Sequence, residues 1–416
     1  MQEVESLFSL LDQKSTFTFS SLETGLFPAA SLQKEAEYTG YSYVWVRDNI
    51  YIAYAHHLNG NTAVAVKNIK TLARYFIKHQ WRLEKIISGE IYCDEPMNRP
   101  HIRFNGEDLS EIAQKWAHAQ NDALGYFVWL FSKLCHEGHA LITAKEKELL
   151  ALFALYFGTI RYWEDEDSGH WEEKKKVEAS SIGVVIGALE ELKILVEETG
   201  DGGFSYQNKA ITRGYLDNLI AQGRKSLDKI LPAECIQDDP SKNRRYDSAL
   251  LFLIFPMRVI AEDEEMADQI LSDVAHHLQG DYGIRRYRGD SFWSADYKKQ
   301  VKPEERTIDV SDNISKRDSL LKAEEEAQWC IFDPIVSIIY RLKYQKSRKE
   351  EHLQLQTYYF NRSLGQLTGE DSPFGAFKCP ELYYLEEGKY VPNDTVPLLW
   401  TQANLWMAFK FLKNTS

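Results

Sequence analysis

Segments of helical periodicity dominate the sequence and constrain its fold more than any other feature. Apolar side chains recur at three- and four-residue intervals, the spacing of one face of an α-helix. Segments with this spacing cover residues 49–58, 62–79, 109–135, 145–157, 179–198, 211–230, 247–260, 264–278, 327–345, 351–367 and 396–412. Strand-like alternation is rare, and no Asn-Gly type of hairpin signal separates two β-rich runs. We therefore predict an all-α protein.

The predicted helices are of two kinds. LLALFALYF (149–157) and SSIGVVIGAL (180–189) have too little polar surface to face water, so we expect both in an inner layer. EDEEMADQILSDVAHHL (262–278) has one polar face, which is typical of an outer helix. Alternation of the two kinds predicts a closed double ring of about six helical hairpins, or about twelve helices. Because no linker or low-complexity tract interrupts the chain, we expect residues 1–416 to form one domain.

Charge and cysteine content exclude several classes of protein. The net charge is −13 and the basic residues are scattered, so neither nucleic acid nor a membrane surface is an expected partner. The five cysteines are far apart and form no CxxC pair, which argues against a disulfide framework or a thiolate zinc site. The sequence does not indicate an oligomeric state.

No classical targeting signal is recognisable in the sequence. The N-terminus lacks the basic-then-apolar order of a classical signal peptide, and the longest apolar run, 149–160, is too short to span a bilayer. We expect a cytoplasmic protein; export without a classical leader is the alternative.

Seven motifs that combine an aromatic side chain with an acid, an amide or an arginine lie before or between the predicted helices. They are YSYVWVRD (41–48), QKWAHAQND (114–122), GHWEE (169–173), RRYDSALL (244–251), GIRRYRGDSFW (283–293), EEAQW (325–329) and CPELYY (379–384). A helical ring would bring them to one rim. Aromatic faces stack on sugar rings, while carboxylates and guanidinium groups bond the hydroxyls. We interpret the rim as a carbohydrate site.

These motifs resemble the glucoamylase family of inverting glycoside hydrolases, family 15, in type and order. The shared elements are YxYxWxRD, WxxxQxD, WEE, RYxxD and a late C-terminal Glu. HIRFNG (101–106) and PELYY (380–384) are most similar to the glucoamylase-like region of the phosphorylase kinase regulatory subunits. The resemblance covers about residues 41–412. It implies an (α/α)6 barrel that hydrolyses α-glucans such as glycogen, starch or maltooligosaccharides, without a metal or a cofactor.

The resemblance also implies the catalytic pair. Glu172 matches the general acid, and Trp171 is expected to shield it, since burial beside an indole keeps a carboxyl protonated. Glu381 matches the general base. Glu386 and Glu387 are alternatives, but they lie in a charged turn. This sequence departs from the hydrolases after Glu381, where Leu382 replaces the usual Gln.

The remaining expected site residues are substrate contacts. Arg47 and Asp48 resemble the pair that bonds the outer hydroxyls of the terminal glucose, and Glu173 matches an acid near the leaving group. The full set is Tyr41, Trp45, Arg47, Asp48, Trp116, Gln120, Asp122, Trp171, Glu173, Arg286, Asp290 and Trp329. For Gln120 and Asp122, the alternative is a role in capping the following helix.

Two other functions stay open at this stage. The chain could be a glucan-binding or regulatory module without turnover, as the kinase-subunit resemblance suggests. The same barrel could act on trehalose or α-1,6 glucans. The segment His136-Glu-Gly-His139 carries metal-ligand residue types but lacks a third partner in the sequence, so we interpret it as a solvated loop.

Overall fold

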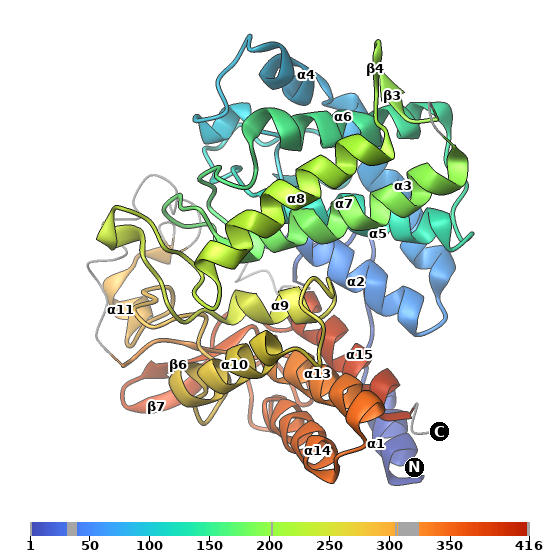
Figure 1. The fold of residues 1–416 in the computed structure, drawn as a ribbon. Helices are drawn as coiled ribbons and strands as arrows, with labels where there is room; N and C mark the ends of the chain where they lie inside the picture. The colour runs from blue at the N-terminus through green and yellow to red at the C-terminus, as the bar shows by residue number, and fades with distance from the viewer. Residues whose placement is uncertain (1, 31–39, 201–202, 304–305, 307–323, 414–416) are drawn as a thin grey trace.

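The structure is a computed structural model that describes residues 2–30, 40–200, 203–303, 306 and 324–413 (Figure 1). Its main helices are α1 (Gln2–Gln13), α2 (Val46–Leu58), α3 (Thr62–Lys78), α4 (Trp81–Ser88), α5 (Asn121–His136), α6 (Ala144–Ile160), α7 (Ala179–Thr199), α8 (Arg213–Ile230), α9 (Leu251–Ile254), α10 (Glu265–Asp273), α13 (Phe332–Ser347), α14 (Glu350–Gly365) and α15 (Leu399–Lys413). The strands are short: β1 (Val44–Trp45), β2 (Arg103–Phe104), β3 (Ser205–Tyr206), β4 (Lys209–Ala210), β5 (Gln328–Trp329), β6 (Leu382–Glu386) and β7 (Lys389–Pro392).

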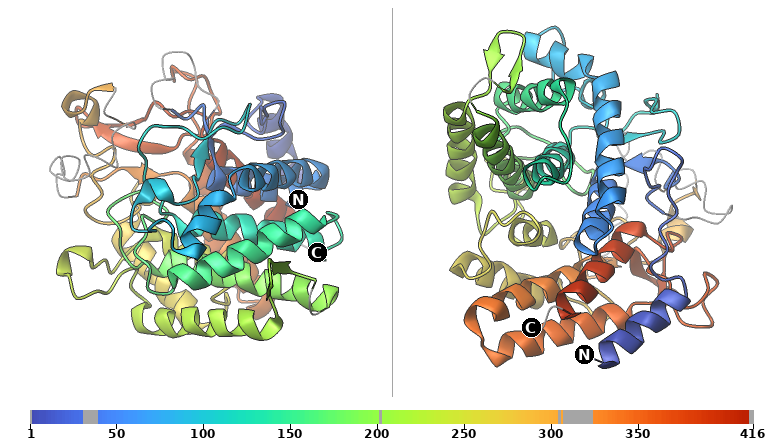
Figure 2. Two further views of the ribbon diagram at one scale, coloured as in Figure 1. Left: turned by 90° about the horizontal axis from the view of Figure 1, so that it is seen from above. Right: turned by 90° about the vertical axis from the view of Figure 1, so that its right-hand side faces the viewer.

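Six inner helices form a closed ring. In the order of their contacts they are α2, α5, α7, α9, α13 and α15, and α15 packs against α2 to close the circle. Outer helices pack on them: α3 on α2, α8 on α7, α10 on α9, α14 on α13 and α1 on α15 (Figures 1 and 2). The outer helix α6 packs against α3 and α7, and its Phe153 ring lies 5.5 Å from that of Phe127 on α5. Inner and outer helices alternate along the chain. Within the described residues this is a six-pair (α/α)6 barrel, as predicted.

Burial explains which helices are inner ones. Every residue of α5 except Lys133 and His136 is buried, and so are most residues of α2, α7 and α15. The outer helix α8 buries only five of its 18 residues, on one face. Helices that are apolar on all sides lose the most water-exposed surface in the inner ring. The stretch 149–157 is an exception: it was predicted for the inner layer but belongs to the outer helix α6, whose outer side is covered by α4 and β3. None of the described helices combines the length and apolar character needed to cross a bilayer.

The alternation of inner and outer helices also determines at which rim of the barrel each loop lies. All inner helices begin at the same rim, and the connections that enter them are long, for example 161–178 and 366–398. The connections that leave them at the other rim are short, for example 59–61 and 348–349. The long loops therefore gather at the N-terminal ends of the inner helices.

Three predicted helices were too long. The segment predicted as helix over 109–135 becomes helical only at Asn121, because residues before it bond elsewhere: the Ser168 amide donates to the Ala119 carbonyl at 2.6 Å. The helix predicted over 247–260 ends at Ile254, two residues before Pro256, which lacks an amide hydrogen. The helix predicted over 327–345 begins at Phe332, since β5 pairs with β6 instead.

Two hairpins were missed by the sequence analysis. The strands β3 and β4 turn through residues 207–208, and β6 and β7 turn through Glu387 and Gly388. Both of these residues have a positive φ, 50° and 79°. The Glu-Gly turn therefore supplies the left-handed backbone that an Asn-Gly signal usually marks.

The close approach of α5 and α7 yields a stability prediction. A Cβ atom on Gly125 would meet the Val184 side chain at 3.0 Å and the backbone of Val184 and Val185 at 3.2 Å. Gly125→Leu should therefore lower the free energy of unfolding by about 3 kcal/mol, measured by urea denaturation. Gly214→Leu on α8, where nothing lies within 4 Å of the added Cβ, should be nearly neutral. Equal stability of the two variants would contradict this packing.

Candidate active site

The long loops enclose a pocket of about 670 Å³, a volume that includes its open mouth. It is lined by Ala29, Tyr41, Trp45, Arg47, Asp48, Trp116, His170, Trp171, Glu172, Arg286, Phe292, Trp329, Glu381, Leu398 and Trp400. These residues come from the segments ahead of α2, α5, α7, α13 and α15, or from the first turns of α2 and α15. Both predicted catalytic carboxyl groups, Glu172 and Glu381, are among them.

Glu172 reaches the pocket from a strained turn ahead of α7. Its φ is 57°, in the left-handed region that non-glycine residues rarely adopt. The turn is held by two backbone bonds, from the Glu172 amide to the Gly169 carbonyl at 3.4 Å and from the Glu173 amide to the Ser168 carbonyl at 3.2 Å. As a result, Glu172 lines the pocket and Glu173 does not. Burial raises the pKa of the Glu172 carboxyl, against the nearby charge of Arg47.

Glu381 is buried beside the start of β6 and is held as a hydrogen-bond acceptor. The Tyr41 hydroxyl donates to its Oε1 at 2.6 Å, and the Asn393 amide donates to its Oε2. Burial raises the pKa of Glu381, while these donors lower it by favouring the carboxylate. The pKa of Glu381 is raised overall, and its two donors favour the carboxylate, the form that accepts a proton from water.

Two neighbouring aromatic side chains connect the carboxyl groups. The Trp45 indole Nε1 donates to Glu172 Oε1 at 3.0 Å, and the ring of Trp45 lies 5.3 Å from that of Tyr41, which bonds Glu381. A two-residue pairing of β1 with β2 holds Trp45 in place. Both carboxyl groups are thus positioned from one short segment ahead of α2.

Arg47 and Asp48 both line the pocket, but they do not pair with each other. Arg47 Nε donates to Asp122 Oδ2 at 2.7 Å, and its terminal nitrogen donates to Gln120 Oε1 at 2.6 Å and to the Gly169 carbonyl at 3.2 Å. Gln120 and Asp122 lie behind the pocket wall. Their role is to fix the Arg47 guanidinium and, through it, the loop that carries Glu172.

Two other predicted contacts also lie behind the wall. Glu173 accepts from Arg244, from Lys176 at 2.8 Å and from the Tyr287 hydroxyl at 2.6 Å, which holds its pKa well below its usual range despite burial. Asp290 accepts two bonds from Arg286, at 2.6 and 2.7 Å. Asp290 therefore orients Arg286, the member of this pair that lines the pocket.

Aromatic side chains form most of the remaining wall. The Arg286 guanidinium lies 4.7 Å from the Trp329 ring and 5.2 Å from the Trp171 ring, whose indole nitrogen donates to Asp247 at 2.9 Å. Among the described residues, the indole nitrogens of Trp116, Trp329 and Trp400 are buried without a hydrogen-bond partner. Buried donors without partners are uncommon in folded proteins, and here they adjoin the pocket. Acceptors on a bound ligand would satisfy them.

The sequence analysis did not assign His170, Phe292, Ala29 or Leu398 to the site. His170 belongs to the same motif as Glu172, which was the available signal. Burial lowers the pKa of His170 to about 4, so its imidazole is neutral. It bonds the Tyr126 hydroxyl and Ser180 Oγ, both at 3.1 Å, and thereby supports the pocket floor from α5 and α7.

The pH dependence of stability should report the environment of Asp48. Burial raises the pKa of Asp48 to about 7, with Glu172 adding to the effect and Arg47 opposing it. An unfolded chain releases this proton near pH 4, so the folded protein binds more protons between about pH 4 and 7 and loses stability as the pH rises. In Asp48→Asn, the decrease in the free energy of unfolding between about pH 4 and 7 should be smaller than in the wild type by up to about 4 kcal/mol. Urea denaturation across this pH range measures the difference. Parallel curves for the variant and the wild type would contradict the burial of an ionisable Asp48.

Comparison with known proteins places this chain in a family. The model of the glycosyl hydrolases family 15 matches residues 13–371, a range that contains Glu172 and ends before Glu381. The liver isoform of the phosphorylase b kinase regulatory subunit alpha from Oryctolagus cuniculus is 24% identical over 308 residues, which cover 68% of this chain and 23% of that protein. The probable alpha subunit from Caenorhabditis elegans is 23% identical over 398 residues, which cover 87% of this chain and 30% of that protein.

The chain spans less than a third of the length of these curated relatives. Two solved structures are similar over nearly their whole length. A glycosidase superposes with a TM-score of 0.70 at 15% identity, covering 99% of this chain and 98% of that one. The glucoamylase of Saccharomycopsis fibuligera superposes with a TM-score of 0.59 at 14% identity, covering 99% and 96%. These similarities confirm the (α/α)6 barrel, and the match over most of the sequence shows that the chain belongs to the glycosyl hydrolases family 15.

Proposed function

We propose that this protein hydrolyses α-1,4 glucosidic bonds of glycogen, starch or maltooligosaccharides with inversion at the anomeric carbon. The observation that carries the proposal is the presence of Glu172 and Glu381 in one pocket, positioned by adjacent Trp45 and Tyr41. An inverting glycosidase requires one protonated and one ionised carboxyl group on opposite sides of the scissile bond.

The two carboxyl groups have different surroundings, which suit different roles. Glu172, whose pKa burial raises, donates its proton to the glycosidic oxygen as the bond to the anomeric carbon breaks. Glu381, stabilised as a carboxylate by Tyr41 and Asn393, accepts a proton from the water that attacks the opposite face. The products are β-glucose and a glucan shortened by one unit. Proton exchange with solvent then restores both groups.

Binding of a neutral, hydroxyl-rich ligand suits the rest of the pocket. Aromatic faces from Trp45, Trp171 and Trp329 can stack on sugar rings, and Arg286 and Asp48 can bond hydroxyls. Unpaired indole donors add further partners for sugar oxygens. The negative net charge does not repel such a ligand. No metal or cofactor is required by this scheme.

A second candidate function is a glucan-binding or regulatory module without turnover. The curated relatives are named as regulatory subunits of a kinase, which favours this alternative. Trehalose and α-1,6 glucans are further possible substrates for the same barrel. Incubation with glycogen, maltotriose, isomaltose and trehalose, followed by chromatography of the products, separates these functions. We expect glucose from maltotriose and glycogen; binding without any product would reverse the proposal.

Substitution of each acid tests its assignment. Glu172→Gln and Glu381→Gln should each lower kcat on maltotriose by about 10³-fold, because each removes one proton-transfer step. Glu386→Gln is the matched control, since Glu386 accepts from Tyr384 at 2.7 Å outside the pocket and should retain activity. Calorimetric binding of maltotriose to the two inactive variants would show that their pockets are intact. A variant with wild-type kcat would remove that acid from the mechanism.

A further inference from the structure

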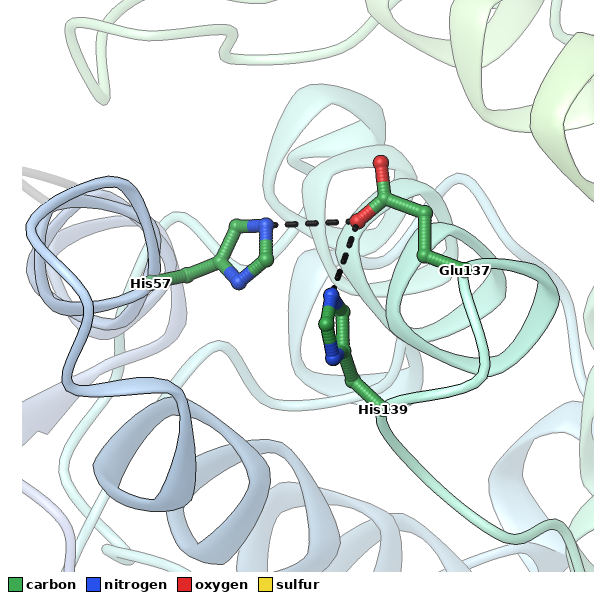
Figure 3. Close-up of side chains that lie close together, drawn as sticks. All are labelled: His57, Glu137 and His139. Atoms are coloured by element: carbon green, nitrogen blue, oxygen red, sulfur yellow. Dashed lines mark ion pairs between the residues drawn. The ribbon is translucent and has the colours of Figure 1, made fainter.

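A cluster of metal-ligand side chains lies at the rim opposite the pocket. His57 occupies the last turn of α2, Glu137 follows the last residue of α5, and His139 lies two residues further along. The segment that contains Glu137 and His139 lacked a third partner in the sequence, and the structure supplies it from α2, 80 residues earlier. Figure 3 shows both imidazoles pointing toward the Glu137 carboxylate.

The three side chains are close enough to share one ion. His57 Nε2 lies 3.2 Å from Glu137 Oε2, and His139 Nε2 lies 3.9 Å from the same oxygen. One ligand atom of each residue lies within 4.8 Å of the other two. Ligands about 2.0–2.2 Å from a zinc ion in tetrahedral geometry are roughly 3.3–3.5 Å apart. A small rotation of the exposed His139 side chain would bring the set to that spacing.

Neighbouring groups hold the ligands in a suitable state. Thr62 Oγ1 lies 3.2 Å from His57 Nδ1 and can accept a hydrogen bond from Nδ1–H, which leaves the lone pair of Nε2 directed at the cluster. Lys133 donates to the other carboxylate oxygen, Glu137 Oε1, at 2.8 Å and so orients the carboxylate. His136 is engaged elsewhere, with Glu191 at 2.7 Å.

The position in the fold also favours a cation. The inner helices α2 and α5 both end here, and the C-terminal end of a helix carries partial negative charge. His139 and Glu137 are accessible to solvent, so an ion can enter without opening the barrel. Two imidazoles and one carboxylate suit zinc, whereas magnesium and calcium prefer oxygen ligands alone.

We propose that His57, Glu137 and His139 form a zinc-binding site that ties the α2–α3 connection to the α5–α6 connection. Three protein ligands leave the fourth position of a tetrahedral ion for water. The 16 residues of α5 separate this site from the pocket by about 24 Å. Zinc bound there therefore stabilises the barrel and takes no part in the chemistry of the pocket.

Zinc titration of the full chain tests this site. After removal of metals with a chelator and dialysis, zinc chloride should bind with one equivalent by isothermal titration calorimetry and should raise Tm. Magnesium or calcium chloride should do neither. His57→Ala and His139→Ala should each weaken zinc binding at least about 100-fold, beyond the 10–100-fold typical of outer-shell changes. His276→Ala, an exposed histidine bonded to the Ser272 carbonyl, is the matched control and should bind zinc normally.

Variants of Thr62 distinguish a role in positioning the His57 imidazole from a general loss of structure. Thr62→Val should weaken zinc binding about tenfold by freeing the His57 tautomer, and Thr62→Ser should restore it. The proposal is overturned if the wild type binds no zinc, if the His57 and His139 variants bind it as the wild type does, or if calcium raises Tm equally. The His139 side chain is 42% exposed, so His139→Ala should fold, and an unchanged Tm without metal would show that its loss of zinc binding is not a loss of folding.

Discussion

The common direction of the six inner helices is the constraint on which the rest of the molecule depends. Because each inner helix is followed by an outer one that returns, every inner helix must begin at the same rim. The loops at that rim are free to lengthen without disturbing the apolar ring beneath them. Residues as distant as Tyr41, Glu172 and Glu381 consequently meet in one pocket.

Within the pocket, the competition between burial and hydrogen bonding decides what each acid can do. Burial raises the pKa of Glu172, Glu381 and Asp48 and so favours the protonated form of each. Donors from Tyr41 and Asn393 act on Glu381 in the opposite direction. Arg47, held by Asp122 and Gln120 behind the wall, lowers the pKa of Glu172 and of Asp48 through its charge and so also opposes the effect of burial.

The sequence was most informative where local pattern and tertiary environment agree. The all-apolar stretch 180–189 of α7 was correctly assigned to the inner layer, whereas the equally apolar stretch 149–157 belongs to the outer helix α6, where α4 and β3 cover its outer side. The segment 109–120 shows the limit: its helical periodicity was real, but Glu111 pairs with Phe104 and the Ala119 carbonyl accepts from Ser168 in the loop ahead of α7. No property of the segment itself reveals those partners.

The site residues also fall into those that the sequence identified and those that depend on tertiary contacts. Pocket residues that belong to a motif, such as Glu172 and Arg286, were identified. The sequence did not predict which residues of a motif line the pocket and which lie behind its wall and hold the lining residues in place. Glu173 is the clearest example, since its partners Arg244 and Tyr287 are distant from it in the sequence. Asp290, in contrast, is bonded by Arg286 of its own motif. His57 could not be connected with Glu137 and His139 from sequence at all, because the barrel alone brings α2 beside α5.

The central claim is that Glu172 and Glu381 act from opposite sides of one bond. Proton NMR of the glucose first released from maltotriose tests it most directly, since the anomeric signal is read before mutarotation. Inversion predicts β-glucose as the initial product. Initial α-glucose would contradict the account, because it requires a covalent intermediate or attack from the same side.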